Sequence, residues 1–381
     1  MPVAGARDDP ELNLLIEHPQ ARIGRRGFLR VGALLSAAGV AGCTVGSKAC
    51  PPVGAVNRKP EQLINIYNWS DYIDDRTIPA FQAHSGIRVN YEVYSSNEDL
   101  LTRMRAGKDQ WDIVVPTHQF LPTYKRLGLI QPLPLDLIPN VKNIDKAFVE
   151  TDYDPGNKYS VPWQWGTTGI GYNAKRVPGG KVDSWKSIYD PDKSVAGRAS
   201  LLRDASDLIA CTLIYLGKDP NSVKDADLQE VVSLIRSLRG RIRELSSDTY
   251  IDNLAKGRTY IAQGWSGDVF QAADRNRDVA YVIPKEGALR WADVMCIPKD
   301  APHVRNAALF INYVLQPSVN ARISSYVSYG TPVPLSKALL PQEQLRDPSI
   351  YPPASTKLAL VSMEGEKLKK WQTAYNNIVK A

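Results

Sequence analysis

The stretch LINIYNWSDYIDD, residues 63–75, starts as an apolar run and ends in aromatic rings and carboxylates. Its first five residues predict a short strand. Trp69, Asp71 and Tyr72 follow at the point where this strand would end. Because ligands of open α/β sheets bind beyond the carboxyl ends of the strands, the stretch predicts an element of the fold and one wall of a site.

Strand-like and helix-like segments alternate along the rest of the chain. Apolar periodicity and turn residues predict a helix over 76–84, a strand over 87–94, a helix over 98–105 capped by Asn97, a strand over 111–115 and a helix over 120–127. The second half continues with helices over 225–238, 248–256, 304–315 and 364–380, and strands over 259–263, 279–284 and 292–298. This alternation predicts an α/β fold with a mostly parallel sheet.

Length and composition are those of an ordinary globular protein. The 381 residues are enough for about two domains. The hydrophobic fraction is 43% and the charged fraction is 23%, both common values. The net charge is +7, yet the basic residues are scattered and form no run interleaved with aromatic residues. Nucleic acid is therefore not an expected partner.

The N-terminal region has the features of an export signal. RRGFLR (residues 25–30) is a twin-arginine run, and 12 apolar or small residues follow it. That run is too short for a membrane-spanning helix, which needs ~20 residues. A basic region, a short apolar region and small residues in this order predict export through a twin-arginine route. VAGC (residues 40–43) resembles a bacterial lipobox, so Cys43 is expected to carry a lipid.

Processing at Cys43 would divide the N-terminal region into two parts. Residues 1–42 would be the removed export signal, and residues 43–60 would form a lipid-anchored tether rich in Gly, Pro and small residues. Of the other cysteines, Cys50 lies in this tether, whereas Cys211 and Cys296 lie in apolar surroundings typical of buried thiols. A disulfide among these three remains an open alternative.

Motifs of enzymes and metal sites are weak in this sequence. The chain has only four His, none paired with another at metal-ligand spacing, and it has no G-x-S-x-G or phosphate-loop motif. GIGYNA (residues 169–174) matches G-x-G-x-x-A, but PGG follows at 178–180 and prevents a crossover helix. Ser266 in the segment GWSGD has no clear His partner. The sequence predicts no enzyme, no metal site and no cofactor.

Aromatic rings and carboxylates recur together at the ends of predicted elements. Aromatic faces attract cations and pack against methylene chains, and carboxylates form charge-assisted hydrogen bonds with ammonium groups. This combination suits a linear amine with several positive charges. The pairs and single residues concerned are Trp69 with Asp71 and Tyr72, Asp204 with Asp207, Trp265, Trp291 with Asp293, and Tyr329.

Several longer segments together resemble a known protein family. They are YNWSDYI (67–73), SNEDL (96–100), WDIVVPT (111–117), YSVPWQWGTTGIGYN (159–173), RDASD (203–207), IPKEGALRWADVMCIP (283–298) and SYGTPVP (328–334). With these segments the chain resembles, over about residues 61–381, the spermidine/putrescine-binding proteins that serve bacterial ATP-driven importers. Each motif is weak alone, and together they are fairly specific.

The resemblance implies a fold, a function and a ligand site. The fold would be the α/β periplasmic-binding-protein fold, with one lobe formed by 61–167 and 293–337, the other by 168–292 and 338–381, and a hinged ligand cleft between them. A polyamine and the permease of the importer would be partners, and the protein would be a monomer outside the cytoplasm, lipid-anchored to the membrane. The implied ligand-binding residues are Trp69, Ser70, Asp71, Tyr72, Thr117, Gln119, Asp204, Asp207, Ser247, Trp265, Trp291, Asp293 and Tyr329.

Two positions depart from the pattern of that family. Gln119 stands where the family places an aromatic residue, and Asp207 stands where the spermidine binder has a longer acid. Both differences concern the choice of polyamine more than the class of protein. The alternatives are a binder of another small cationic or metal solute on the same fold, a sensor that binds the same ligand, and an exported lipoprotein enzyme.

Overall fold

A computed structural model of the protein describes residues 62–107 and 110–380. The predicted export signal and tether, with Cys43 and Cys50, lie outside the described residues. Cys211 and Cys296 are both buried free thiols, as their apolar surroundings indicate. No helix of the described part is long and apolar enough to span a membrane.

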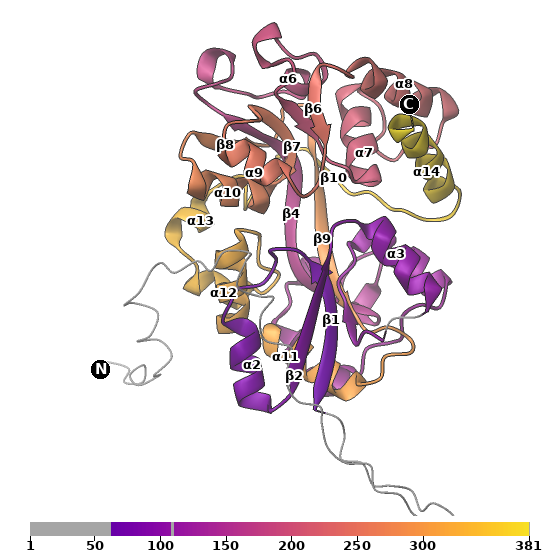
Figure 1. Cartoon of the computed structure of the whole chain (residues 1–381). Helices are drawn as coiled ribbons and strands as arrows, with labels where there is room; N and C mark the ends of the chain where they lie inside the picture. The colour runs from indigo at the N-terminus through magenta and orange to yellow at the C-terminus, as the bar shows by residue number, and fades with distance from the viewer. Residues whose placement is uncertain (1–61, 108–109, 381) are drawn as a thin grey trace, which may run out of the picture. The chain divides into compact units, whose positions relative to one another are not determined.

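The strands form one sheet of mixed direction (Figure 1). Their order is β2-β1-β3-β9-β4-β7-β5-β6, with β10 beside β9 and β8 beside β4. The bounds are β1 Leu63–Trp69, β2 Arg88–Tyr94, β3 Ile113–Val114, β4 Ser160–Asn173, β5 Ala199–Leu201, β6 Ile242–Leu245, β7 Ile261–Trp265, β8 Val279–Val282, β9 Ala288–Cys296 and β10 Leu358–Ala359. The first strand therefore extends to Trp69, two residues further than the sequence predicts.

Apart from the short pair of β10 with β9, parallel pairing occurs at the two ends of the strand order. There β1 pairs with β2 and β3, and β5 pairs with β6 and β7, all in parallel. In the middle, β4 is antiparallel to β7, β8 and β9, and β9 is antiparallel to β3. The prediction of a mostly parallel sheet is therefore wrong for this central region. Periodicity within one segment carries no information about the direction of its partner.

The long strands β4 and β9 connect the two parallel regions (Figure 1). The first half of β4 pairs with β9, from Ser160 opposite Cys296 to Thr168 opposite Leu289. From Thr168 onward, β4 pairs with β7 instead. The sequence suggested that Trp291 and Asp293 lie at the end of a strand. Because β9 starts at Ala288, they lie in its middle instead.

Helices precede and follow most strands, as the alternation predicts. Their bounds are α2 Thr77–Ser85, α3 Asn97–Ala106, α4 Leu121–Arg126, α5 Lys146–Val149, α6 Lys186–Tyr189, α7 Ala205–Tyr215, α8 Asp225–Ser237, α9 Tyr250–Ala255, α10 Ser266–Arg275, α11 Val304–Val314, α12 Pro317–Val327, α13 Gln342–Arg346 and α14 Gly365–Val379. Helix α3 is capped by Ser96, whose side chain accepts from the Asp99 amide, and not by Asn97. Asn97 is the first residue of the helix, and its side chain is buried.

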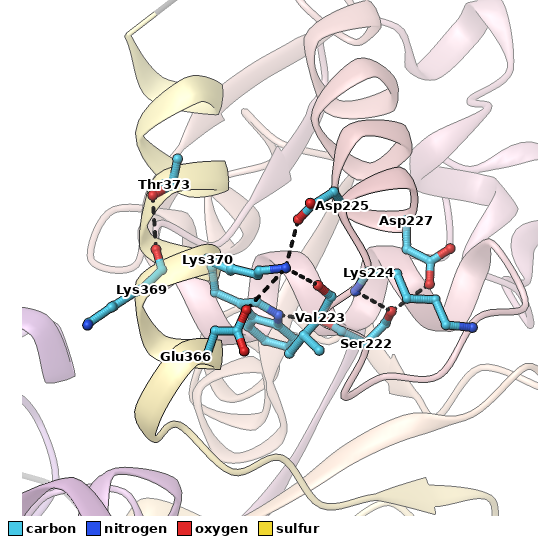
Figure 2. A network of polar contacts seen from close by, with 10 residues as sticks. Ser222, Val223, Lys224, Asp225, Asp227, Glu366, Lys369, Lys370 and Thr373 are labelled. Carbon is cyan, nitrogen blue, oxygen red and sulfur yellow. Dashed lines mark hydrogen bonds and ion pairs between the residues drawn. The ribbon is translucent and has the colours of Figure 1, made fainter.

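The C-terminal helix α14 packs against the start of α8 (Figure 2). The Lys370 ammonium donates to the Val223 carbonyl and to Asp225, over 3.1 and 2.9 Å. Further along α14, the Tyr375 hydroxyl donates to the Arg203 carbonyl. Arg203 immediately precedes Asp204 and the buried helix α7. The end of the chain thus supports the segment that carries one of the predicted acidic pairs.

Candidate functional site

The turn after β1 places its residues in two different environments. The Trp69 indole donates from Nε1 to the Val115 carbonyl over 3.0 Å, and its ring lies 5.8 Å from the Trp265 ring. Ser70 and Asp71 are exposed. Asp71 has a φ of 53°, a left-handed conformation that tightens the turn. The chain then returns inward at Tyr72, which is 4% exposed.

Asp293 is a buried carboxylate held by Thr117. The Thr117 hydroxyl donates to Oδ1 of Asp293 over 2.7 Å. The Tyr72 phenol lies beside this carboxylate, and burial and then Asp293 raise the tyrosine pKa. Burial raises the pKa of Asp293 to about 7, although the contacts with Thr117 and Tyr72 oppose the rise.

Asp207 is a second buried carboxylate, at the first turn of α7. It accepts from the Thr168 hydroxyl over 2.6 Å and from Nε1 of Trp265 over 3.1 Å. Burial and then the neighbouring Asp204 raise the pKa of Asp207 to about 8. Asp204 itself is the N-cap of α7, because its Oδ1 accepts from the backbone amides of Ser206 and Asp207. Of this acidic pair, Asp204 therefore has a structural role as a helix cap.

Three aromatic rings pack around the carboxylates at the middle of β9. The Tyr329 ring lies 5.4 Å from the Tyr72 ring and 5.2 Å from the Trp291 ring. Nε1 of Trp291 donates to the Thr168 hydroxyl, the group that also binds Asp207. Gly166 on β4 leaves room for these rings, since a Cβ there would lie 2.8 Å from Tyr329 and 2.9 Å from Trp291.

Asp268 is a third carboxylate of this region, half-buried, that sequence reasoning missed. It lies in the first turn of α10 and accepts from the hydroxyls of Tyr329 and Tyr250, each over 2.9 Å. Burial raises the pKa of Asp268 to about 6. A signal was present in the segment GWSGD, where the acid comes three residues after Trp265. In that segment the residue pattern indicated Trp265 and Ser266 but not the acid, and the Ser266 hydroxyl accepts from the Thr167 amide.

The predicted ligand-binding residues Gln119 and Ser247 have different hydrogen-bond partners. Gln119 is buried, and its Nε2 donates over 2.6 Å to the hydroxyl of Ser206, which in turn donates to Asp204. Ser247 lies in the loop after β6, where its hydroxyl accepts from the Arg203 amide. The structure brings Gln119 to the acidic pair at α7, whereas the hydroxyl of Ser247 is not hydrogen-bonded to Asp207, Asp268 or Asp293.

These residues form what we call the ring-and-carboxylate cluster. Its members are Trp69, Tyr72, Asp207, Trp265, Asp268, Trp291, Asp293 and Tyr329. Within residues 62–107 and 110–380, no basic side chain is among the groups that perturb its three carboxylates. Buried acids without a basic partner are costly as anions, so the cluster is suited to take up positive charge. The same described residues contain no group of three potential metal ligands.

The fold and this cluster define a binding protein, and comparison with known proteins gives its family. The family model for bacterial extracellular solute-binding proteins matches residues 77–350. The chain belongs to this family, whose members are solute-binding proteins and not enzymes. The sequence-based expectation of a binding protein is thereby confirmed.

Relatives with assigned functions are similar over most of their length. The chain is 37% identical to the putrescine-binding periplasmic protein PotF of Escherichia coli, over 85% of this chain and 92% of that protein. It is 35% identical to the putrescine-binding periplasmic protein SpuD of Pseudomonas aeruginosa, over 78% and 86%. Among solved structures, a putative spermidine/putrescine ABC transporter from Listeria monocytogenes is 32% identical, with a TM-score of 0.79 and coverage of 83% and 98%. The α/β periplasmic-binding-protein fold is confirmed by this match.

Proposed function

We propose that the chain is an extracytoplasmic polyamine-binding protein that delivers putrescine or spermidine to the permease of an ABC importer. One observation carries the proposal: the buried Asp207 and Asp293 and the half-buried Asp268 lie among aromatic rings, and no basic group is among those that perturb their pKa in the described part of the chain. A linear amine supplies ammonium groups for the carboxylates and methylene groups for the rings. The names of the similar proteins support the same class of ligand.

The electrostatics of the cluster favour a ligand with at least two positive charges. Asp293 is among the groups that raise the pKa of Asp207, and Asp268 is among those that raise the pKa of Asp293. Three such carboxylates cannot all ionise cheaply in a buried site. A diammonium ligand would neutralise two of them, and its cationic ends would also interact with the faces of Trp69, Trp265 or Trp291.

The proposal includes two lobes that close on the ligand. The lobes are those expected from sequence, 61–167 with 293–337 and 168–292 with 338–381. The register of β4 supports these boundaries, because β4 pairs with β9 up to Thr168 and with β7 and β8 beyond it. Members of the cluster then come from both lobes, with Tyr72 and Asp293 from the first and Asp207 and Asp268 from the second.

Location and anchoring complete the proposed function. The similar proteins from Escherichia coli and Pseudomonas aeruginosa are periplasmic by name, which supports a place outside the cytoplasm. We expect a monomer held at the membrane by a lipid on Cys43, because VAGC (residues 40–43) has the lipobox pattern. Mass spectrometry of the processed N-terminus distinguishes this anchor from any other.

Titration calorimetry with putrescine and spermidine, against a metal ion and a sugar, tests the proposal. We expect the mature protein to bind an amine and Asp293→Asn to bind it at least ~30-fold more weakly. The reason is that the variant leaves one ammonium buried without its counter-charge, which costs ~2–5 kcal/mol. The matched control is Asp75→Asn, at an exposed acid outside the predicted site, which should keep the parent's affinity. Binding of neither amine, or equal affinity of Asp293→Asn and the parent, would refute the proposal.

A further inference from the structure

Gln164 is a fully buried amide that has no hydrogen-bond partner in the described structure. Its side chain is 0% exposed, and neither Oε1 nor Nε2 is paired. Leaving a buried polar group unsatisfied costs ~1–3 kcal/mol, and buried polar groups in native proteins are almost always paired with protein or water. An amide with two unpaired atoms in the centre of a sheet therefore requires an explanation.

The strand register places Gln164 beside the ring-and-carboxylate cluster. Gln164 on β4 is the direct partner of Asp293 on β9, immediately after an irregularity in the pairing at 162–164. Directly opposed residues of antiparallel strands lie on the same face, with Cβ atoms ~5 Å apart. Because side chains alternate along a strand, Gly166 and Thr168 share this face.

The neighbours of Gln164 on this face all contact the cluster. Gly166 makes room for the rings of Trp291 and Tyr329, and the Thr168 hydroxyl bonds Asp207 and accepts from Trp291. Gln164 is the third residue of this face of β4, and it stands opposite Asp293, one of the carboxylates of the cluster. The unpaired amide therefore faces the groups that the proposed ligand would contact.

We propose that Gln164 binds ligand, and that its Oε1, the Asp293 carboxylate and the Tyr72 hydroxyl together accept the three N–H groups of one primary ammonium. The inference depends on the proposed function, since it describes one end of the same site. A primary ammonium has three N–H donors in a tetrahedral arrangement. The Gln164 amide is buried and unpaired, the Tyr72 hydroxyl lies beside the Asp293 carboxylate, and Oδ1 of Asp293 accepts from Thr117.

This arrangement predicts which amines the site selects. A primary ammonium end donates to all three acceptors. A dimethylated end has one N–H and a trimethylated end has none, so buried oxygens stay unpaired. Sites that are built to hydrogen-bond a ligand reject analogues that lack the donor, because their own polar groups then remain unsatisfied. Gln164 would thus contribute to selectivity for unsubstituted amine ends and not only to affinity.

Gln164→Met tests the inference, because methionine keeps the length of the side chain and removes both polar atoms. Loss of a hydrogen bond to a charged group costs ~1.5–3 kcal/mol, so putrescine affinity by calorimetry should fall about 10- to 100-fold. The free variant should unfold at the same or higher denaturant concentration than the parent, since it loses only unpaired groups. This opposite effect on binding and stability is the signature of a ligand-binding role.

The matched control is Thr259→Val, which removes another buried, unpaired hydroxyl in a residue that precedes β7. It should keep the parent's affinity. If Gln164→Met also binds putrescine within about twofold of the parent, the amide does not contact the ligand and the inference is wrong. If the parent itself binds no amine, the proposed function fails and this inference fails with it.

Discussion

At the scale of single residues, three aspartates determine the character of the site. Burial raises the pKa of Asp207 to about 8, of Asp293 to about 7 and of Asp268 to about 6. Each therefore holds its proton more tightly in the folded protein than in the unfolded chain, where the pKa of Asp is ~3.9. A cationic ligand would displace these protons, so binding and proton release are expected to be coupled.

The raised pKa values give a stability prediction with a defined sign. Between the unfolded and the folded pKa, the folded state binds more protons, so stability falls as pH rises. His118 has the opposite sign, because burial lowers its pKa to about 4 and it adds stability as pH rises to ~6.5. From pH 6.5 to 8, the acids with a raised pKa that still titrate are Asp207, Asp293 and Glu98, whose pKa burial raises. The ligand-free protein should lose ~1–2 kcal/mol of unfolding free energy over this interval.

Denaturant unfolding at pH 6.5 and pH 8 measures this loss. The control is Asp207→Asn, which cannot titrate and should show a smaller loss over the same interval. An unchanged free energy of unfolding in the parent, or an equal fall in both proteins, would mean that Asp207 is ionised throughout.

At the scale of elements, β4 organises the cluster. Gly166 gives space to Trp291 and Tyr329, and Thr168 bonds both Asp207 and Trp291. Five residues beyond Gly166 along the same strand, Gly171 approaches core side chains instead, with Val269 2.7 Å and Leu254 2.9 Å from a Cβ built there. The strand thus has crowded glycines both at the site and in the core.

Substitution of Gly166 and of Gly171 distinguishes an effect on ligand binding from an effect on stability. Gly166→Ala should lower the unfolding free energy by ~1–3 kcal/mol, as overpacking does, and should also weaken putrescine binding because the two rings must move. Gly171→Ala should cost similar stability in denaturant unfolding but bind with the parent's affinity. If calorimetry gives the two variants the same affinity, the packing at Gly166 does not position the rings.

At the scale of the whole molecule, the hydrogen bonds between the proposed lobes describe a closed arrangement. Gln119 of the first lobe donates to Ser206 of the second over 2.6 Å. Tyr329 of the first donates to Asp268 of the second over 2.9 Å. Opening of the hinge would expose these groups and the buried carboxylates to water, which lowers the cost of their charge.

We therefore expect the radius of gyration in solution scattering to fall when saturating putrescine is added to the mature protein. Ligand closes the hinge because only the closed form gives it carboxylates from both lobes. Asp293→Asn at the same putrescine concentration is the control and should show a smaller change. A radius that is independent of ligand in the parent would place the site within one lobe.

The amino-acid sequence by itself determined the elements and the kinds of residue at the site. Helix α2 ends at Ser85 before Gly86, and α14 covers Gly365–Val379, within one or two residues of the ranges read from periodicity and turn residues. The rings and acids at Trp69, Asp207, Trp265 and Asp293 were also found this way, because each stands in a segment whose local pattern is distinctive.

Only the tertiary structure decided which of these residues meet and what each one does. The antiparallel pairing of β4 with β9 puts Gln164 opposite Asp293, and the packing of α10 puts Asp268 against Tyr329. It also makes Asp204 a helix cap and leaves Ser247 outside the cluster. Local periodicity reports which face of a segment is apolar, whereas burial, register and pKa also depend on partners far away in the chain, such as Tyr329 for Asp268, 61 positions apart, and Thr117 for Asp293, 176 positions apart.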